Sequence, residues 1–364
     1  MSSATRNQYN PDYVSPPGDT LLDVLEERGM SQAELAERTG RPRKTINEII
    51  NAKTAITPDT ALQLERVLGI PAQFWSQREQ NYQDSLARQR ERDRLEKQSE
   101  WADQFPFKDM VKLGWVEATQ DTIQQCQTLL NLFAVASPEQ WAKHWGNRYV
   151  AYRKSVAFET DSFATIAWLR QGELKAEKLN CQPYNATRFR KTLDEIRTLT
   201  VQPQQVFVPK IVSLCAEAGV AVVFVPELPK TRVCGVARWL TSTKPLIQMS
   251  FRYRSNDHFW FTFFHESKHV LQEIKDEIFL EGLADYDPDS PMEQEANQFS
   301  ANHLIPPSTF ERFVARHNRF SKVVIEQFAA EIGIAPGIVV GRLQHDDVLA
   351  KSYCNELKQR IQWS

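Results

Sequence analysis

Two histidines, His265 and His269, stand four positions apart with a glutamate, Glu266, directly after the first, in the pattern H-E-x-x-H. The run from Phe259 to Leu271 predicts a helix, and four residues along a helix bring both imidazoles to one face. Two neutral imidazoles on one face can bind zinc, and Glu266 can reach water at an open coordination position. The pattern therefore predicts two metal ligands and the general base of a zinc-dependent hydrolase.

The alternative explanation is an ordinary pair of core or surface histidines. A buried imidazole pair without a partner would be costly, however, and a metal ion is a natural partner for it. The predicted helix is apolar on nearly all sides, which is typical of a core helix. Its aromatic residues directly before the motif are Phe259, Trp260, Phe261, Phe263 and Phe264.

A third ligand is expected downstream, where the segment from Pro291 to Pro306 predicts a second helix. We expect Glu295 to be this ligand because it flanks the apolar side of that helix. Glu293 is the rival and lies two residues away, on a different face. Asp285 and Asp287, in the intervening loop, are weaker candidates. A first-turn role for both glutamates, complementing the helix dipole, is a further alternative. The apolar side is formed by Ala296, Phe299, Ala301 and Leu304.

A second motif lies near the start of the chain. Ser31 to Glu34 forms a capping box that begins one helix, Gly40 ends it, and a new helix begins within three residues. This spacing is typical of a helix-turn-helix, although a plain helical bundle with a polar face is an alternative. The predicted recognition helix runs from Arg43 to Ile50, where Arg and Asn suit base edges and Lys and Thr suit phosphates. Its predicted DNA-binding residues are Arg43, Lys44, Thr45, Asn47 and Lys53.

The chain has 364 residues, of which 41% are hydrophobic and 25% charged, with a formal net charge of −2. This composition is typical of globular proteins and excludes bulk attraction to DNA or membranes, so DNA contact requires a local basic patch. The window 41–53 has four basic residues against Glu48. The five scattered cysteines form no C-x-x-C pair, which predicts reduced thiols in a cytoplasmic protein. We expect no signal peptide and no membrane span.

The pattern along the chain is mainly helical, and the expected fold class is α+β, mainly α. Three strands are expected at 220–225, 234–240 and 246–250, and they would form a small three-stranded sheet before the H-E-x-x-H helix. The expected organisation is a disordered N-terminus (1–16), a five-helix helix-turn-helix domain (17–82), a charged helical linker (83–100), a helical region (101–200), a metallopeptidase-like domain (201–307) and a helical C-terminal tail (308–364).

Two families resemble parts of this chain. Pro17 to about Tyr82 resembles the Xre-type, HigA-like antitoxin and repressor domain, through the runs 31–36, 46–51 and 56–61. Residues from about Ala221 to Ile305 are similar to the ImmA/IrrE metallo-endopeptidases, through Phe263–Glu266 with His269 and through the run 295–306. The resemblance implies a gluzincin-like zinc site in which His265, His269 and Glu295 bind the metal and Glu266 is the general base.

Three positions depart from these families. Lys268 stands where a small or apolar residue is usual, which puts tight packing of that helix in doubt. His303 replaces an apolar residue, and a surface or core position is expected for it. Ala52 replaces a glycine that many such repressors have after the recognition helix, and Asn51 is expected to take the left-handed turn instead.

The two motifs with these resemblances imply a transcriptional regulator that is fused to a zinc endopeptidase. By resemblance, the regulator would bind operator DNA as a homodimer and the endopeptidase would cleave a partner protein. The alternative is an antitoxin or repressor of a toxin-antitoxin or defence system, with a toxin as partner, whose metal domain senses or stabilises without turnover. An intact Glu266 favours the first hypothesis because a structural site does not need a base.

Overall fold

The computed structural model describes residues 14–153, 161–274, 279–281 and 290–363. The chain divides into two compact units, Met1–Ser99 and Glu100–Ser364. The segment 1–16 is expected to be disordered, and its first 13 residues lie outside the described residues. The weaker ligand candidates Asp285 and Asp287 also lie outside them.

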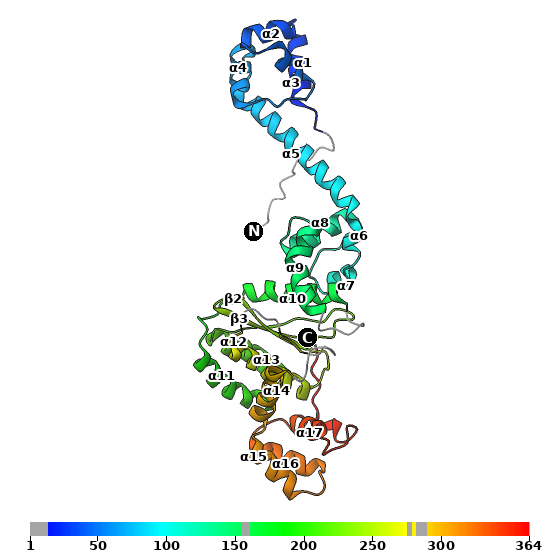
Figure 1. Ribbon diagram of the computed structural model, residues 1–364, viewed down its shortest axis with the longest axis vertical. Coiled ribbons are helices and arrows are strands. Elements are labelled where there is room, and N and C mark those ends of the chain that lie inside the picture. The colour runs from blue at the N-terminus through cyan, green and yellow to red at the C-terminus, as the bar shows by residue number, and fades with distance from the viewer. Residues whose placement is uncertain (1–13, 154–160, 275–278, 282–289, 364) are drawn as a thin grey trace. The chain divides into compact units, whose positions relative to one another are not determined.

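The described part of the N-terminal unit contains five helices, as the sequence predicts (Figure 1). Their apolar faces form one core, in which Leu21, Leu35, Ile46, Leu64 and Trp75 are completely buried. Burial of these faces supplies most of the stability, because helices of this length are marginal alone in water. The helices are α1 (Pro17–Glu27), α2 (Gln32–Thr39), α3 (Arg43–Ile50), α4 (Pro58–Leu68) and α5 (Ala72–Lys97).

Local sequence explains where the helices of this unit begin and end. The Ser31 hydroxyl accepts a hydrogen bond from the Glu34 amide at the start of α2, and Gly40 ends α2 with φ of 67°. After α3, Asn51 has φ of −87° and Ala52 has φ of 54°. The expectation that Asn51 takes the left-handed turn is therefore wrong. Ala52 takes it, at a conformational cost that a glycine would not have.

Helix α5 runs without interruption from Ala72 to Lys97. The expected boundary between the first domain and a charged linker, at residue 82, therefore falls inside one helix.

The C-terminal unit begins with a helical region, as expected. Its helices are α6 (Ser99–Ala102), α7 (Phe107–Lys112), α8 (Thr122–Phe133), α9 (Pro138–Arg153), α10 (Ser162–Glu177), α11 (Ala186–Thr198), a 3₁₀ turn (Leu199–Val201) and α12 (Gln204–Glu217).

The sheet contains the three predicted strands, β1 (Ala221–Phe224), β2 (Gly235–Thr241) and β3 (Lys244–Met249). Strand β1 pairs parallel with β3, and β2 pairs antiparallel with β3. A short strand that the sequence does not predict, β4 (Phe279–Glu281), pairs antiparallel with β2, so the order is β1-β3-β2-β4. The mainly helical class with a small mixed sheet is confirmed.

Helices cover both faces of the sheet. Ala221, Val223 and Leu246 belong to the same apolar cluster as Trp168 and Leu169 of α10. The alternate residues of the strands, such as Val222, Ala237 and Ile247, belong to a larger cluster with α11, α12 and α13 (Asn256–Gln272). Alternation along a strand sends successive side chains to opposite faces, and here both faces are buried. The H-E-x-x-H helix, α13, is thus the core layer on one face.

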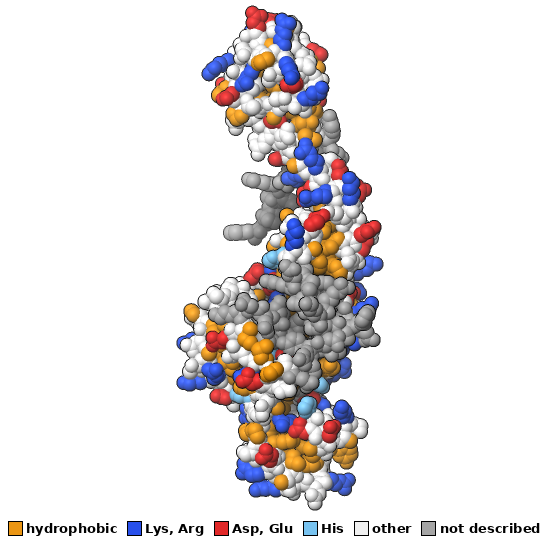
Figure 2. Space-filling model, viewed as in Figure 1, with side chains coloured by type: hydrophobic (Ala, Val, Ile, Leu, Met, Phe, Trp, Pro, Cys, Tyr) orange, Lys and Arg blue, Asp and Glu red, His pale blue; other side chains and the backbone are white. Residues whose placement is uncertain are grey.

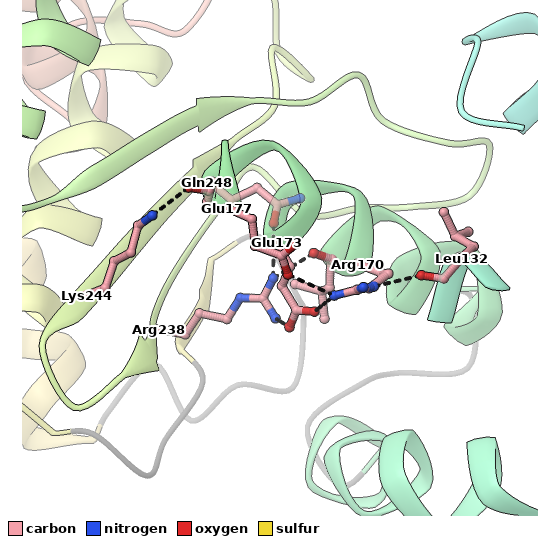
Figure 3. Close-up of polar contacts among 9 residues, drawn as sticks. Leu132, Arg170, Glu173, Glu177, Arg238, Lys244 and Gln248 are labelled. Atoms are coloured by element: carbon pink, nitrogen blue, oxygen red, sulfur yellow. Dashed lines mark hydrogen bonds and ion pairs between the residues drawn. The ribbon is translucent and has the colours of Figure 1, made fainter. Parts of the chain in front are cut away.

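A buried polar network attaches α10 to the other face of the sheet (Figure 3). Arg238 of β2 is 4% exposed and donates to Glu173 of α10 at 2.9 Å. Arg170 donates to the same carboxylate at 2.8 Å, and the Gln248 amide donates to the Trp168 carbonyl at 2.7 Å. Removing one partner of such a buried ion pair typically costs about 3–5 kcal/mol. The network therefore fixes α10 against the sheet.

The described chain ends in four more helices and a 3₁₀ turn. No single helix among the described residues is long and apolar enough to cross a membrane, although α16 and α17 together reach that length and composition with a bend of 111° between them. The elements are α14 (Pro291–Leu304), α15 (Pro307–Arg316), α16 (Lys322–Ile332), α17 (Pro336–His345) and the 3₁₀ turn Asn355–Leu357.

Candidate functional site

The two histidines of the H-E-x-x-H motif lie inside the C-terminal unit. Helix α13 is packed on nearly all sides, so that His265 and His269 are each 2% exposed and Glu266 is fully buried. The expectation that the aromatic helix carries the imidazoles into the interior is confirmed. Their Nε2 atoms point to one place, 3.0 Å apart.

Helix α14 supplies a carboxylate to the same place. The Ser290 hydroxyl accepts from the Glu293 amide and begins the helix, which puts Glu293 in its first turn. Glu293 Oε1 lies 2.8 Å from His269 Nε2, and Oε2 lies 3.1 Å from His265 Nε2. These three buried side chains offer ligand atoms that all lie within 4.8 Å of one another.

The expectation that Glu295 is the third ligand is wrong, because Glu295 lies outside this cluster. Its side chain is 57% exposed and pairs with Lys268 at 2.9 Å. The buried stripe of α14 runs through Glu293, Ala296, Ser300 and Leu304. Steps of three, four and four residues keep these side chains on one helix face, and Glu295 lies off that face. The spacing from Glu293 to Ala296 was the signal in the sequence that favoured Glu293.

The other two departures are also explained. Lys268 is 19% exposed and held by Glu295, so it does not disturb the packing of α13. His303 lies against Phe264 and Phe299, with ring centroids 4.7 and 5.3 Å away, and burial lowers its pKa. It is half-buried among aromatic rings, within the expected choice of a surface or core position.

The electrostatics of Glu293 suit a cation. Burial by itself would raise the pKa of its carboxyl, but its contacts with the His265 and His269 rings outweigh burial and lower the pKa to about 2. The carboxylate is therefore ionised at neutral pH and contributes a negative charge inside the protein.

The donor atoms of the cluster also fit a metal ion. The Nδ1 atoms of His265 and His269 each lie 2.9 Å from an amide oxygen, Asn297 Oδ1 and Gln272 Oε1 respectively. An amide oxygen only accepts, so it favours a proton on each Nδ1 and a lone pair on each Nε2. Two imidazole nitrogens and a carboxylate directed at one point could hold a cation, and two histidines with one glutamate form a common catalytic zinc set.

Glu266 does not join this cluster. The residue after His265 on a helix turns about 100° away from it, and the turn brings Glu266 to the first residue of β2. A Cβ atom on Gly235 would lie 2.8 Å from Glu266 Cγ and 2.9 Å from Oε1. Gly235 thus permits the carboxylate to lie beside the strand, which the sequence did not indicate.

A cavity of about 810 Å³ lies between α13, α14 and α17. Thr262 lines it one helical turn before Glu266, and Cys234 lines it next to Gly235. Asn297, which contacts His265, lines it as well. The cavity therefore reaches the immediate neighbours of both Glu266 and His265. His258 also lines it and stacks on Tyr253 at 4.5 Å between ring centroids.

The predicted DNA-binding residues lie on the surface of the N-terminal unit. Arg43, Lys44, Asn47 and Lys53 are exposed, and Thr45 is half-buried. Figure 2 shows Lys and Arg side chains over this unit, interspersed with Asp and Glu. The Asn47 amide donates to Gln32 Oε1 at 3.4 Å, so the first residue of α2 helps to hold it. Sequence reasoning did not include Gln32.

The N-terminal unit is thus a helix-turn-helix domain, and the C-terminal unit contains a metallopeptidase-like domain. A family model described as helix-turn-helix matches residues 21–75, and a peptidase family model described as IrrE N-terminal-like domain matches residues 228–344. The chain therefore contains a helix-turn-helix domain in its first unit and an IrrE N-terminal-like domain in its second. Both predicted resemblances are confirmed.

Curated relatives match the N-terminal unit. Virulence-associated protein A of Dichelobacter nodosus is 36% identical over 72 residues, which are 19% of this chain and 71% of that protein. An uncharacterised helix-turn-helix transcriptional regulator of Escherichia coli, YddM, is 32% identical over 59 residues, or 16% of this chain and 63% of that protein.

Solved structures match over a similar length. A HigA-family addiction module antidote protein from Coxiella burnetii is 28% identical and covers 23% of this chain and 92% of its own, with a TM-score of 0.22. A putative antidote protein of a plasmid maintenance system from Nostoc punctiforme is 30% identical. It covers 23% of this chain and 91% of its own, also with a TM-score of 0.22.

Proposed function

We propose that this protein is a DNA-binding transcriptional regulator whose C-terminal unit is a zinc-dependent endopeptidase acting on a partner protein. The observation that carries the proposal is the convergence of His265, His269 and Glu293 on one point, with Glu266 one residue from a ligand. A structural zinc site needs no neighbouring base, whereas hydrolysis does.

Each residue of the site would have a separate role. His265, His269 and Glu293 would hold the ion through two nitrogens and one oxygen. Zinc bound there would polarise a peptide carbonyl and make water a better nucleophile. Glu266 would take a proton from the attacking water and give it to the leaving amine. The cavity beside Thr262 and Asn297 is large enough for several residues of an extended peptide.

The peptidase proposal is tested with Glu266→Gln, which removes the base and keeps the three ligands. We expect purified wild-type protein to contain about one zinc ion per chain and to cleave a co-expressed neighbouring gene product. Glu266→Gln should bind zinc equally and cleave nothing. Glu311→Gln is the matched control, because Glu311 is an exposed glutamate of α15 outside the cluster, and it should still cleave. Cleavage by Glu266→Gln would refute the assignment of the base.

One observation favours a second candidate function. Glu266 is fully buried and the three clustered side chains are at most 5% exposed, which also suits a metal site that stabilises or senses without turnover. The protein would then be an antitoxin or repressor that binds operator DNA and a toxin. In that case Glu266→Gln and wild type would leave the neighbouring protein equally intact, while loss of Glu293 would still destabilise the C-terminal unit.

For DNA, we propose that α3 enters the major groove of an operator bound by a homodimer. Arg43→Ala or Asn47→Ala should cost about 1–3 kcal/mol on the preferred sequence and relax preference at one position. Lys53→Ala should weaken binding to all sequences alike, as loss of a phosphate contact does. Arg66→Ala, an equal charge change on α4, is the control. Gel shifts after selection from random DNA measure these effects, and unchanged binding by all three variants would contradict the proposal.

A further inference from the structure

The ring orientation of His269 depends on a chain of side chains that reaches the surface. His269 Nδ1 lies 2.9 Å from Gln272 Oε1. The other end of that amide, Gln272 Nε2, lies 3.0 Å from Glu295 Oε2 and 3.3 Å from the Met292 carbonyl oxygen. Glu295 Oε1 in turn lies 2.9 Å from Lys268 Nζ. Gln272 thus connects the Lys268–Glu295 ion pair to the buried imidazole.

The contacts of Gln272 leave its amide only one orientation. An amide presents a donor end and an acceptor end, and reversing it exchanges them. Met292 offers a carbonyl oxygen and Glu295 a carboxylate, and neither has a proton to donate. The other oxygen of Glu295 pairs with the Lys268 ammonium at 2.9 Å, as a carboxylate that accepts does. The NH₂ end of Gln272 must therefore face Met292 and Glu295, and its oxygen must face His269.

The orientation of the Gln272 amide favours one tautomer of His269. A neutral imidazole carries its proton on one nitrogen and a lone pair on the other, and a neighbouring acceptor selects which nitrogen is protonated. Gln272 Oε1 only accepts and therefore favours a proton on Nδ1, against the pull of the Glu293 carboxylate, whose Oε1 lies 2.8 Å from Nε2. The Nε2 lone pair then faces Glu293 and His265, where it can bind a metal. In the opposite tautomer, a proton on Nε2 would occupy the ligand position.

We propose that Gln272 is a positioning residue for the metal centre: its amide, oriented by Glu295 and Met292, holds His269 in the tautomer that can bind zinc. The inference rests on the proposed metal site and extends it to residues outside the cluster. Glu295 then acts on the site without touching the ion, because it orients the amide that orients the imidazole.

The test measures zinc affinity and tautomer state, not cleavage. Gln272→Leu removes the acceptor, and we expect zinc affinity to fall about 10–100-fold in competition with a chromophoric chelator. Long-range ¹H–¹⁵N NMR of the metal-free protein should show a larger fraction of the Nδ1–H tautomer of His269 in wild type than in Gln272→Leu. Glu295→Ala should give a smaller loss of affinity, since the amide can then reverse.

Two variants keep the test decisive. Gln294→Leu makes the same exchange at an exposed position of α14 and should bind zinc as wild type does. Gln272→Glu retains an acceptor for Nδ1–H and should keep most of the affinity that Gln272→Leu loses. Wild-type affinity and an unchanged tautomer in Gln272→Leu would overturn the inference, as would equal losses in both Gln272 variants. Failure of wild type to bind zinc would instead overturn the proposed metal site.

Discussion

The helix pairs α2–α3 and α16–α17 share one backbone arrangement in two different units. Each first helix ends at a left-handed glycine, Gly40 with φ of 67° and Gly333 with φ of 69°. In each pair the amide after the glycine donates 3.0 Å to the carbonyl of an alanine four residues before the glycine, Ala36 or Ala329. A three-residue turn then leads into the second helix. The two turns therefore have the same backbone form.

Their side chains have opposite environments. Aligned on the glycines, Lys44 and Asn47 of α3 correspond to Gly337 and Val340 of α17. The two α3 residues are exposed, whereas the two α17 residues are buried. Helix α17 packs on α13, and a Cβ atom on Gly337 would lie 2.6 Å from Asn256 Oδ1. The second helix of one pair thus offers polar groups to solvent, and that of the other supports the H-E-x-x-H helix. A shared turn does not imply a shared function.

The largest expected difference between the two pairs is their response to zinc. At free zinc about 1,000-fold above Kd, binding should stabilise the C-terminal unit by about 4 kcal/mol. Hydrogen-exchange mass spectrometry of the full chain should show slower exchange in α13, α14 and α17 and no change in α2–α3. Glu293→Gln should remove most of this protection. Equal protection of both helix pairs would show that the ion binds elsewhere or to both units.

The next largest effect comes from exchanging the residues at the aligned positions. Val340→Asn places an amide without a designed partner in the core and should destabilise the C-terminal unit by about 3 kcal/mol. Asn47→Val, the reverse exchange at the exposed position, should change stability by less than about 0.5 kcal/mol and weaken DNA discrimination. Local exchange rates measure the first effect and gel shifts the second. A tolerated Val340→Asn would mean that α17 is not a core element.

Substitution of the two turn glycines should have a smaller effect on stability, and the effect should be the same at both positions. Nothing lies within 4 Å of a Cβ atom at Gly40 or Gly333, so only conformational strain opposes a side chain there. Gly40→Ala and Gly333→Ala should each cost about 1 kcal/mol. Denaturant unfolding followed by hydrogen exchange in each unit measures both costs. Very different costs would contradict the equivalence of the two turns.

The smallest effect is expected after α3, where the N-terminal pair has a strained residue. Ala52 has φ of 54°, and Ala52→Gly should relieve about 1 kcal/mol of strain while increasing the entropy of the unfolded chain. The net stabilisation should be about 0.5 kcal/mol in the N-terminal unit. Unchanged or reduced stability would show that Ala52 is not strained in solution.

Sequence reasoning succeeded where the signal was local. The caps at Ser31 and Gly40, the helical spacing of His265 and His269, and the alternating strands each follow from neighbours within a few residues. It failed for Glu295 because two acids in one helical turn differ only in which one faces the packing partner. The buried stripe from Glu293 to Leu304 is a pattern in the sequence, but the half-buried Phe299 and Ala301 obscured it.

The sequence by itself determined the two families, the helix-turn-helix near the N-terminus and the pair of histidines on one helix face. Those features depend on helix geometry and on short-range capping, which a single segment contains. Only the tertiary structure decided that Glu293 meets the histidines, that Asn297 faces His265 Nδ1, that Met292 and Glu295 contact Gln272, and that α17 is buried. These contacts join residues about 20 to 80 positions apart, and the packing of whole helices against one another sets which side chains meet.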